Sequence, residues 1–530
     1  MNPSNLERLI GLKVQRRPLL LGTGFLASLA FSQALSHAST ATTLAQPKFA
    51  AYPFSLGVAS GDPLPESVVL WTRLAPDPLK GMSLPPVNIP VEWQVAKDEK
   101  LAQVVAKGTI LARPELAHAV HVVVEGLEPG HWYWYQFKSG NEVSPIGRTR
   151  TAPAPGTLLD RLAIAFASCQ NYEQGYYTAY QHMAREDLDL VFHLGDYIYE
   201  GTAQPGHPRQ HLGANPVDLE SYRLRYALYK TDPDLQAAHA AFPFICTWDD
   251  HEVENDYAGD QSETFADPAQ FRQQRLAAYQ AYYEHLPLRP TAMLQGTNMQ
   301  LYRQFNFGNL AQFHVLDSRQ YRDDQPCANG KGGGQLVSNC QARLASDRTL
   351  LGQQQERWLL DGLGRSQSRW NVIAQQYLMA ELDQLPGAGE VYWSDNWDGY
   401  AASRKRILEF IDQRQIANAV VLGGDIHSFW VTDLKPDFRD DQSPVVATEF
   451  VGTSISSRGI PYDFFAGLLT NNPQIKFFDS RFRGYVQCTL TPDRWTTHLR
   501  VVDSVAQPGA PLRTLATFVV ENGRPGAVRA

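Results

Sequence analysis

Residues 188–196 read LDLVFHLGD, a nearly continuous apolar run that ends in a glycine and a carboxylate. A short run of this kind predicts a strand buried on both faces, as in a parallel sheet covered by helices. The polar end is equally informative, because open α/β sheets hold their ligands at the carboxyl ends of their strands. The stretch therefore predicts an α/β fold with Asp196 at its functional edge.

The same pattern of an apolar strand followed by a metal-type ligand recurs along the chain. It occurs at residues 161–167 before Cys169, at 242–247 before Asp250 and His251, and at 419–422 before Asp425 and His427. Another strand is predicted at 371–374, and helices at 271–286 and 404–413 alternate with the strands. A single carboxylate after a strand is often a helix cap. Four strand ends that carry Cys, Asp and His together favour a shared metal site.

Such a site suits the hydrolysis of phosphate esters. A phosphate ester is anionic and repels hydroxide, whereas two or more cations a few Å apart hold the phosphoryl oxygens and lower the pKa of a bound water. Asp196 could bridge two cations, and a histidine beside the ligands could protonate the leaving oxygen. The residues thus predict a metal-dependent phosphoesterase with a phosphate ester as substrate.

Residues 45–153 follow a different pattern. Short runs of β-branched and aromatic residues at 68–71, 91–95 and 121–124 predict strands. The sequence LEPG at 127–130 precedes WYWYQF at 132–137, which resembles the tyrosine corner of β-sandwich domains. We therefore expect an all-β, immunoglobulin- or fibronectin-like sandwich. A Pro-rich linker at 152–156 would connect it to an α/β domain over 157–530.

Residues 1–38 have the layout of an export signal. Arg16 and Arg17 precede an apolar run at 19–35, and Ser36 and Ala38 are small residues suited to cleavage. The arginine pair predicts the twin-arginine export machinery as a partner. A membrane anchor is the alternative, although the glycine and polar residues within the run make it a poor permanent span. The expected location is outside the cytoplasm, either periplasmic or secreted.

The chain has five cysteines and a net charge of −8. An odd number of cysteines in an exported protein indicates one pair and some buried thiols. Cys327 and Cys340 flank the glycine-rich segment 328–334, so they are the predicted disulfide. Cys246 and Cys488 lie in apolar segments and are expected in the core. The acidic balance argues against a broad nucleic-acid-binding surface, but cations can still attract an anionic substrate.

Four strings resemble the motifs of the PhoD-type alkaline phosphatases. They are ASCQ at 167–170, HLGDYIYE at 193–200, TWDDHEVEND at 247–256 and GDIHS at 424–428. The resemblance extends over almost the whole mature chain. It implies a metallophosphoesterase α/β sandwich behind the β-sandwich domain, with activity on phosphate monoesters and diesters.

The resemblance also implies a set of metal ligands. Those of a ferric ion (Fe3+) would be Cys169, Asp196, Tyr199 and His427. Calcium, expected as two Ca2+ ions, would be bound by Asp196, Asn255 and Asp425. The donor types agree in part with this division, since thiolate and phenolate suit iron, while carboxylate and amide oxygens suit calcium.

The remaining site residues are catalytic or substrate-binding candidates. The resemblance makes His251 the acid or transition-state stabiliser, with Asp250 beside the metals. Arg319, Arg322 and Arg458 follow strand-like segments, and a guanidinium can bind phosphate with two hydrogen bonds. For the first two, which follow Asp317, a surface ion pair is an equally good interpretation. Residues Thr453, Ser454 and Ser456 are further pocket candidates.

Two alternatives remain open at this point. One is a purple-acid-type phosphatase, which has an Asp or His in place of Cys169 and an Asn-His pair in place of Asp250-His251. The other is a non-catalytic binding protein of the cell envelope. Nothing in the residues selects among monoesters, nucleotides, phospholipid head groups and envelope polymers as the physiological ester.

Overall fold

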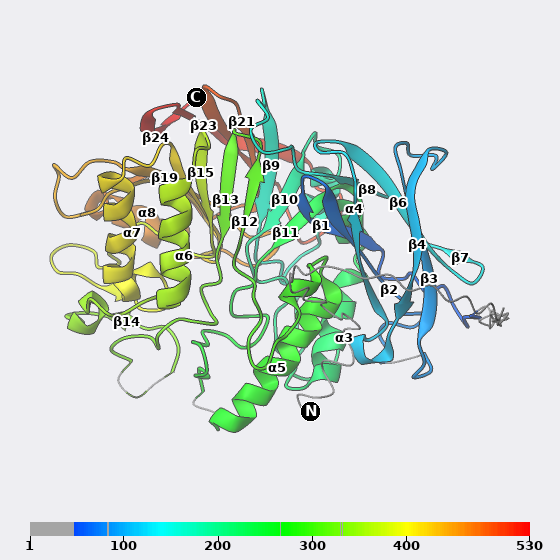
Figure 1. Ribbon diagram of the computed structural model, residues 1–530. Coiled ribbons are helices and arrows are strands. Elements are labelled where there is room, and N and C mark those ends of the chain that lie inside the picture. Colours follow the sequence, from blue (N-terminus) through cyan, green and yellow to red (C-terminus); the bar gives the residue numbers. More distant parts are fainter. Residues whose placement is uncertain (1–46, 82–83, 265–266, 329, 331) are drawn as a thin grey trace, which may run out of the picture. The chain divides into compact units, whose positions relative to one another are not determined.

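The computed structural model describes residues 47–81, 84–264, 267–328, 330 and 332–530 (Figure 1). The predicted export signal at 1–38 lies outside these residues. In the part of the chain that the structure describes, no helix combines the length and the apolar character that crossing a membrane requires.

The first of two large sheets has ten strands, in the order β24-β23-β22-β21-β9-β10-β11-β1-β2-β5. Its parallel centre consists of β9 (Leu162–Ala167), β10 (Leu190–His193), β11 (Pro243–Cys246) and β1 (Val58–Leu64). Every residue of β9, β10 and β11 is buried, as their apolar runs predict. Ala167 pairs with His193, and His193 with Cys246, so these strands end side by side.

The second sheet has seven strands, in the order β12-β13-β15-β17-β19-β18-β20. Its parallel centre consists of β13 (Ala311–Val315), β15 (Trp370–Ala374), β17 (Ala419–Gly423) and β19 (Ala447–Val451). The flanking strands β12 (Arg303–Phe307), β18 (Phe429–Leu434) and β20 (Ile475–Asp479) are antiparallel to their neighbours. The parallel strands of this sheet also bring their carboxyl ends to one edge.

The two sheets share one hydrophobic core. Phe166 and Phe192 of the first sheet belong to the same buried cluster as Phe313 and Val372 of the second. The rings of Phe192 and Phe313 lie 4.8 Å apart. Burying a side chain of this size stabilises the fold by about 1.5–3 kcal/mol. The facing sheets are therefore held together largely by apolar burial.

Helices cover the outer face of each sheet. The first sheet is covered by α2 (Thr178–Met183), α3 (Leu219–Lys230), α4 (Pro233–Ala241) and α5 (Pro268–His285). The second is covered by α6 (Gly352–Arg365), α7 (Ala401–Gln413) and α8 (Tyr462–Gly467), and Figure 1 shows α6 and α7 side by side against it. The resulting helix–sheet–sheet–helix arrangement confirms the predicted α/β sandwich.

An all-β domain precedes this sandwich, as predicted. The strands β3 (Ile89–Ala96), β4 (Val104–Ala112), β6 (Trp132–Ser139), β7 (Glu142–Val143) and β8 (Gly147–Arg150) form its outer sheet. This sheet packs on β1, β2 (Ser67–Arg73) and β5 (Ala119–Glu125). The Tyr133 hydroxyl accepts a hydrogen bond from the Glu128 N–H at 2.9 Å, which confirms the tyrosine corner.

The connection between the β-sandwich and the rest of the chain is closer than the sequence indicates. Strand β1 pairs in parallel with β11, with Gly61 opposite Phe244, so β1, β2 and β5 extend the ten-stranded sheet. A Cβ at Gly61 would lie 2.5 Å from the Pro287 carbonyl oxygen and 2.6 Å from that of Phe244. Only glycine fits this approach, because real Cβ contacts are never so short.

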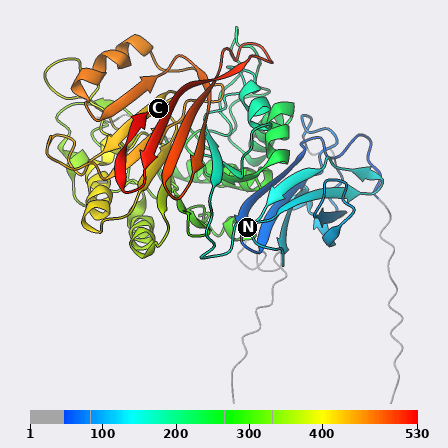
Figure 2. The ribbon, with the colours of Figure 1, turned by 90° about the horizontal axis from the view of Figure 1, so that it is seen from above.

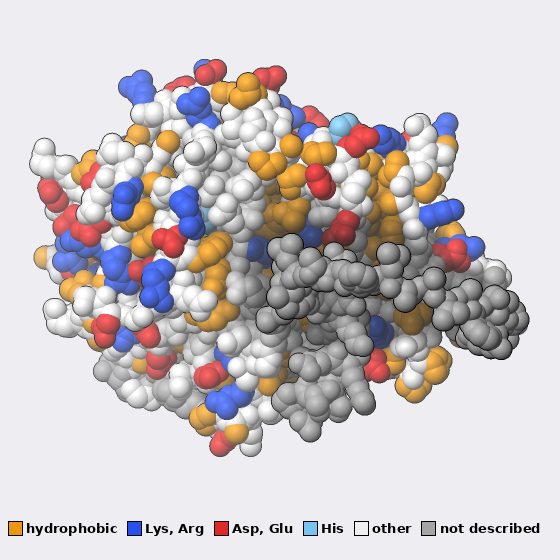
Figure 3. All heavy atoms as spheres, in the orientation of Figure 1, with side chains coloured by type: hydrophobic (Ala, Val, Ile, Leu, Met, Phe, Trp, Pro, Cys, Tyr) orange, Lys and Arg blue, Asp and Glu red, His pale blue; other side chains and the backbone are white. Residues whose placement is uncertain are grey.

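The other edge of the ten-stranded sheet is formed by the end of the chain. The strands β21 (Arg483–Leu490), β22 (Arg494–Val502), β23 (Leu512–Glu521) and β24 (Arg524–Arg529) form an antiparallel meander beside β9. Figure 2 shows these strands in orange to red, adjacent to one another. On the face seen in Figure 3, basic and acidic side chains are interspersed.

The predicted disulfide between Cys327 and Cys340 is present. It closes a loop next to the small sheet of β14 (Leu336–Val337) and β16 (Tyr392–Trp393). The other cysteines, including Cys246 in β11 and Cys488 in β21, are buried free thiols, as predicted for these two.

Replacing both Cys327 and Cys340 with serine should lower the free energy of unfolding by up to about 3 kcal/mol, because the bond restricts a short loop of the denatured chain. Urea denaturation measures this difference. As a control, a reductant should destabilise the wild-type protein and leave the double-serine variant unaffected. Equal stability of the two proteins without reductant would contradict the prediction.

Candidate metal centre

Loops after the central strands meet at one edge of the two sheets. The Cys169 N–H donates to the Gly195 carbonyl and the Gln170 N–H to that of Asp196, both at 3.1 Å. The Gln376 side chain, after β15, donates to the backbone carbonyls of Trp248 at 2.8 Å and Leu316 at 3.1 Å. These bonds hold loops from both sheets together, so the polar residues after each strand converge.

The four predicted iron ligands lie together. One ligand atom from each of Cys169, Asp196 and His427 lies within 4.8 Å of the other two. The Tyr199 hydroxyl is 2.6 Å from Asp196 Oδ2 and 3.0 Å from His427 Nε2. A thiol, a phenol, an imidazole and a carboxylate therefore point toward one small volume.

Two further groups adjoin this one. Asp196 forms a second group with Asp250 and His251, and Asp249, Asp250 and Asp425 form a third, again with ligand atoms within 4.8 Å of one another. Asp196 thus belongs to two groups, as expected for a bridging carboxylate. Asn255 lies beside them, and its backbone N–H donates to Glu200 at 2.7 Å.

The backbone at these positions is in the left-handed region. The φ angles are 59° at Cys169, 57° at Asp196, 62° at Asp425 and 52° at His427. This conformation costs on the order of 1–3 kcal/mol for each residue with a side chain, and such strain concentrates at functional sites. Gly195, with φ +118°, leads into the turn, and a Cβ there would lie 2.6 Å from that of Asp249.

Several acidic side chains are buried at this site, and not all of their oxygens have a hydrogen-bond partner among the described residues. Asp196 Oδ1 is buried and has no hydrogen-bond partner among the described residues. Burial, followed by the neighbouring acidic groups, raises the pKa of Asp196, Asp425 and Cys169 well above the ordinary values. An uncompensated buried charge is costly, and a bound cation removes that cost. The donors and their charge therefore fit metal ions.

The two histidines of the cluster are held in different states. Burial and then Arg483 lower the pKa of His427 to about 4, and its Nδ1 lies 2.8 Å from the Arg458 carbonyl. Its proton is therefore on Nδ1, and Nε2 is free to act as a ligand. Burial also lowers the pKa of His251, but Glu200, Asp250 and Asp196 outweigh this and raise it well above its ordinary value. In its protonated form, His251 could donate a proton from this position.

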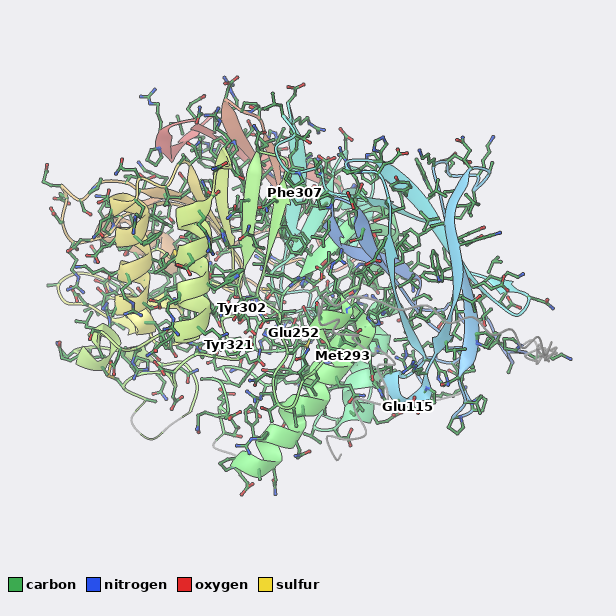
Figure 4. The ribbon with its side chains drawn as sticks, viewed as in Figure 1. Glu115, Glu252, Met293, Tyr302, Phe307 and Tyr321 are labelled. Carbon is green, nitrogen blue, oxygen red and sulfur yellow. A yellow bond between two sulfur atoms is a disulfide. The ribbon has the colours of Figure 1, made fainter. Side chains whose placement is uncertain are left out.

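Three residues that sequence analysis did not single out complete the cluster. Glu200 Oε2 lies 2.6 Å from His251 Nδ1. Glu252, labelled near the centre of Figure 4, accepts from the Tyr197 N–H at 2.6 Å and the Asp249 N–H at 2.9 Å. The Ser457 hydroxyl donates to the Cys169 carbonyl at 2.8 Å and lies 3.0 Å from the Tyr199 hydroxyl. Glu200 and Glu252 lie within the quoted motifs, a signal that could have identified them.

The three candidate arginines lie in two different environments. Arg319 and Arg322 are buried and form ion pairs with Asp395, so the ion-pair interpretation holds for both, though not at the surface. Arg458 is exposed, and its backbone carbonyl bonds to His427 at the cluster. Among the three, its guanidinium is the one positioned to meet a ligand from solvent.

The three residues after β19 that were expected to line a pocket form hydrogen bonds to backbone carbonyls instead. The hydroxyls of Thr453, Ser454 and Ser456 donate to the carbonyls of Phe482, Ser457 and Asn171, respectively. All three are buried. They fix the loop that carries Ser457 against Cys169.

Comparison with known proteins agrees with this arrangement. A family model described as PhoD-like phosphatase matches residues 164–499, and its N-terminal domain model matches residues 38–153. The chain is 49% identical to alkaline phosphatase D of Bacillus subtilis (strain 168) over 520 residues, which are 96% of this chain and 88% of that protein. A solved structure titled "Structure of PhoD" is 50% identical and superposes with a TM-score of 0.87, covering 91% of this chain and 93% of the other.

The family model alone spans more than half of the chain, and the similarity in sequence and in structure extends over nearly all of it. The chain therefore belongs to the PhoD-like phosphatase family.

Proposed function

We propose that this protein is an exported, metal-dependent phosphatase that hydrolyses phosphate monoesters and diesters. The observation that carries the proposal is the convergence of Cys169, Tyr199 and His427 on Asp196, a buried carboxylate with an unpartnered oxygen. Its relative in Bacillus subtilis is named an alkaline phosphatase, which supports the same reaction class.

The donor types suggest which cations would bind. Thiolate, phenolate and imidazole suit iron, so Cys169, Tyr199, His427 and one oxygen of Asp196 would hold Fe3+. Oxygen donors suit calcium, so the other oxygen of Asp196, together with Asp425 and Asn255, would hold Ca2+, for which two ions are proposed. When bound, such cations lower the pKa of a coordinated water and draw charge from the phosphoryl oxygens.

The protein's own residues position the proton donor. Glu200 contacts Nδ1 of His251, so Nε2 is the nitrogen that can face a substrate. A protonated His251 ring held in this orientation would donate to the departing alkoxide. Asp250 accepts the backbone N–H groups of His251 and Asp256 at 3.0 and 2.8 Å, which fixes the loop. We assign the contact with the substrate phosphate to Arg458, because its side chain is exposed beside the cluster.

Export is supported by two features. Residues 1–38 have the layout of a twin-arginine signal, and the Cys327–Cys340 disulfide is of a kind that persists in oxidising compartments. The location proposed is periplasmic or secreted. Substitution of Arg16 and Arg17 by lysine should keep the protein in the cytoplasm, because the pair is the recognised element of the signal. Fractionation of expressing cells measures this, and normal export of the variant would reject the twin-arginine route.

Metal removal tests the proposed chemistry. The wild-type protein should hydrolyse p-nitrophenyl phosphate and bis-p-nitrophenyl phosphate. A calcium-selective chelator should abolish both activities while iron stays bound, because the carboxylate and amide oxygens bind calcium separately from the thiolate site. Added calcium should restore the rate.

Three outcomes of this experiment are decisive. Full activity without calcium would favour the purple-acid-type alternative. Hydrolysis of only one ester would narrow the substrate class. Absence of turnover by the metal-loaded protein would favour a binding function in the cell envelope.

Cys169 is the test of the iron site. A ferric ion bound by thiolate and phenolate should give a visible charge-transfer band, so the purified protein should be coloured. Cys169→Ser should shift or remove that band, lower the iron content and reduce kcat by roughly 10- to 100-fold or more.

Cys246→Ser is the matched control, because Cys246 is an equally buried thiol at the end of β11. This variant should lose stability and keep its iron and colour. Retention of iron, colour and rate by Cys169→Ser would show that Cys169 is a core thiol.

A further inference from the structure

Arg319 is fully buried beside the candidate metal centre, in the loop that follows β13. Its Nε donates to Asp249 Oδ1 at 2.7 Å, and its Nη1 donates to the Tyr257 carbonyl at 3.2 Å. Its Nη2 lies 2.8 Å from Asp395 Oδ2 and 3.4 Å from Asp250 Oδ2. Nε and Nη1 are therefore hydrogen-bonded to protein acceptors, whereas Nη2 lies near two carboxylates without a hydrogen bond to a described residue. The nearby carboxylates compensate the buried charge.

The loop holds this side chain in place. Asp317 Oδ1 accepts the backbone N–H of Arg319 at 3.0 Å and the indole N–H of Trp248 at 2.9 Å. Trp248 directly precedes Asp249 and Asp250 in the chain. The loop with the arginine is therefore fixed to the loop with the two aspartates, and Arg319 is not free to turn toward a substrate.

The two consecutive aspartates have different partners. Asp249 Oδ1 accepts from Arg319 Nε at 2.7 Å and from the Tyr377 hydroxyl at 2.8 Å. Asp250 accepts backbone N–H groups, and its contact with Arg319 is the longer one, at 3.4 Å. The cationic side chain therefore compensates Asp249 more closely than it does Asp250.

This difference matters because Asp249, Asp250 and Asp425 form one of the three candidate cation groups. Three carboxylates at such short distances from one another would bind calcium more strongly than two, since the total charge of the ligands sets calcium affinity. We infer that Arg319 is a positioning residue that withholds Asp249 from cation binding and leaves Asp250 and Asp425 to bind. The inference rests on the proposed metal-dependent function and adds Asp250 to the calcium ligands proposed above.

The experiment compares calcium content in Arg319→Met, Arg319→Lys and the wild type, by elemental analysis after dialysis and by calorimetric titration. Arg319→Met leaves Asp249 free to join Asp250 and Asp425, so this variant should bind calcium more tightly and retain more of it after dialysis than the wild type. Its kcat should fall roughly 10- to 100-fold, the usual effect of disturbing the surroundings of metal ligands. Its KM should change less than about twofold, because Arg319 does not contact substrate. Arg319→Lys restores the charge and should recover the wild-type calcium content.

Two other arginines serve as controls. Arg404 in α7 is equally buried and pairs with Asp398 at 2.6 Å and Glu381 at 2.9 Å, outside the three cation groups. Arg404→Met should therefore lose stability without a change in calcium content. Arg458→Gln should raise KM, which is the signature of a lost substrate contact.

If Arg319→Met fails to fold, the double variant Arg319→Met/Asp249→Asn removes the unpaired charge as well, and it should fold with the wild-type calcium content. An unchanged calcium content in folded Arg319→Met would overturn the inference, whatever its kcat. A rise in KM alone would assign Arg319 to phosphate binding instead. A wild-type protein that binds no calcium and hydrolyses neither ester would contradict the proposed function, and the inference with it.

Discussion

Negative charge buried at the ends of the central strands is the constraint on which the rest of this structure depends. Asp196, Asp249, Asp250 and Asp425 lie within a few hydrogen-bond lengths of one another, and Cys169 adjoins them. Such a cluster opposes folding unless positive charge accompanies it. Among the described residues, Arg319 pairs with Asp249 and Asp250, and His251 lies beside Asp196 and Asp250. Asp196 lies beside His251, yet its Oδ1 has no hydrogen-bond partner among the described residues. The cations proposed above would offset the charge that remains there.

The sheets make this arrangement possible because they are rigid. Apolar burial between the two sheets fixes where each strand ends, and hydrogen bonds from Gln376 and Cys169 join the loops beyond those ends. Left-handed backbone at Cys169, Asp196, Asp425 and His427 then turns each side chain toward the centre. The energy that this strain costs is supplied by the packed core, which is the usual relation between scaffold and site.

Much of the fold, and the strand ends at which the candidate ligands meet, could be predicted because both depend on local pattern; the individual ligand roles came from the resemblance to the family. Continuous apolar runs such as residues 188–194 identify buried strands, and ligand-type residues after them identify the functional edge. The pairing of β1 with β11 could not be predicted, since strand neighbours depend on contacts distant in sequence and β1 has no unusual composition. The antiparallel meander of β21 to β24 could not be predicted from the sequence for the same reason.

For the arginines, residue type and position in the sequence are not enough to predict the environment of the side chain. Arg319 pairs with Asp249 and Asp395, which lie 70 and 76 residues away in the chain. A long side chain can reach partners in several directions, so its neighbours in sequence do not reveal whether it meets solvent or a buried carboxylate. The short side chains of Cys169 and Asp196 stay close to the backbone, and strand position is enough to place them. Serine hydroxyls such as that of Ser457 are equally uninformative, because most of them bond to a nearby carbonyl.

Because β1, β2 and β5 of the β-sandwich belong to the ten-stranded sheet, the structure of the α/β domain depends on the β-sandwich. Strand β1 is enclosed between β11 and β2, and Asp62 at its end pairs with Arg303 of β12 at 2.7 Å. The same arginine donates to the Cys246 carbonyl at 2.9 Å, three residues before Asp249. The β-sandwich therefore supports the strand that leads into the candidate metal centre, and removing it would expose an edge of β11 and leave Arg303 without its carboxylate. A β-sandwich connected in this way is part of the structural support of the site, in contrast to a module joined only by a linker.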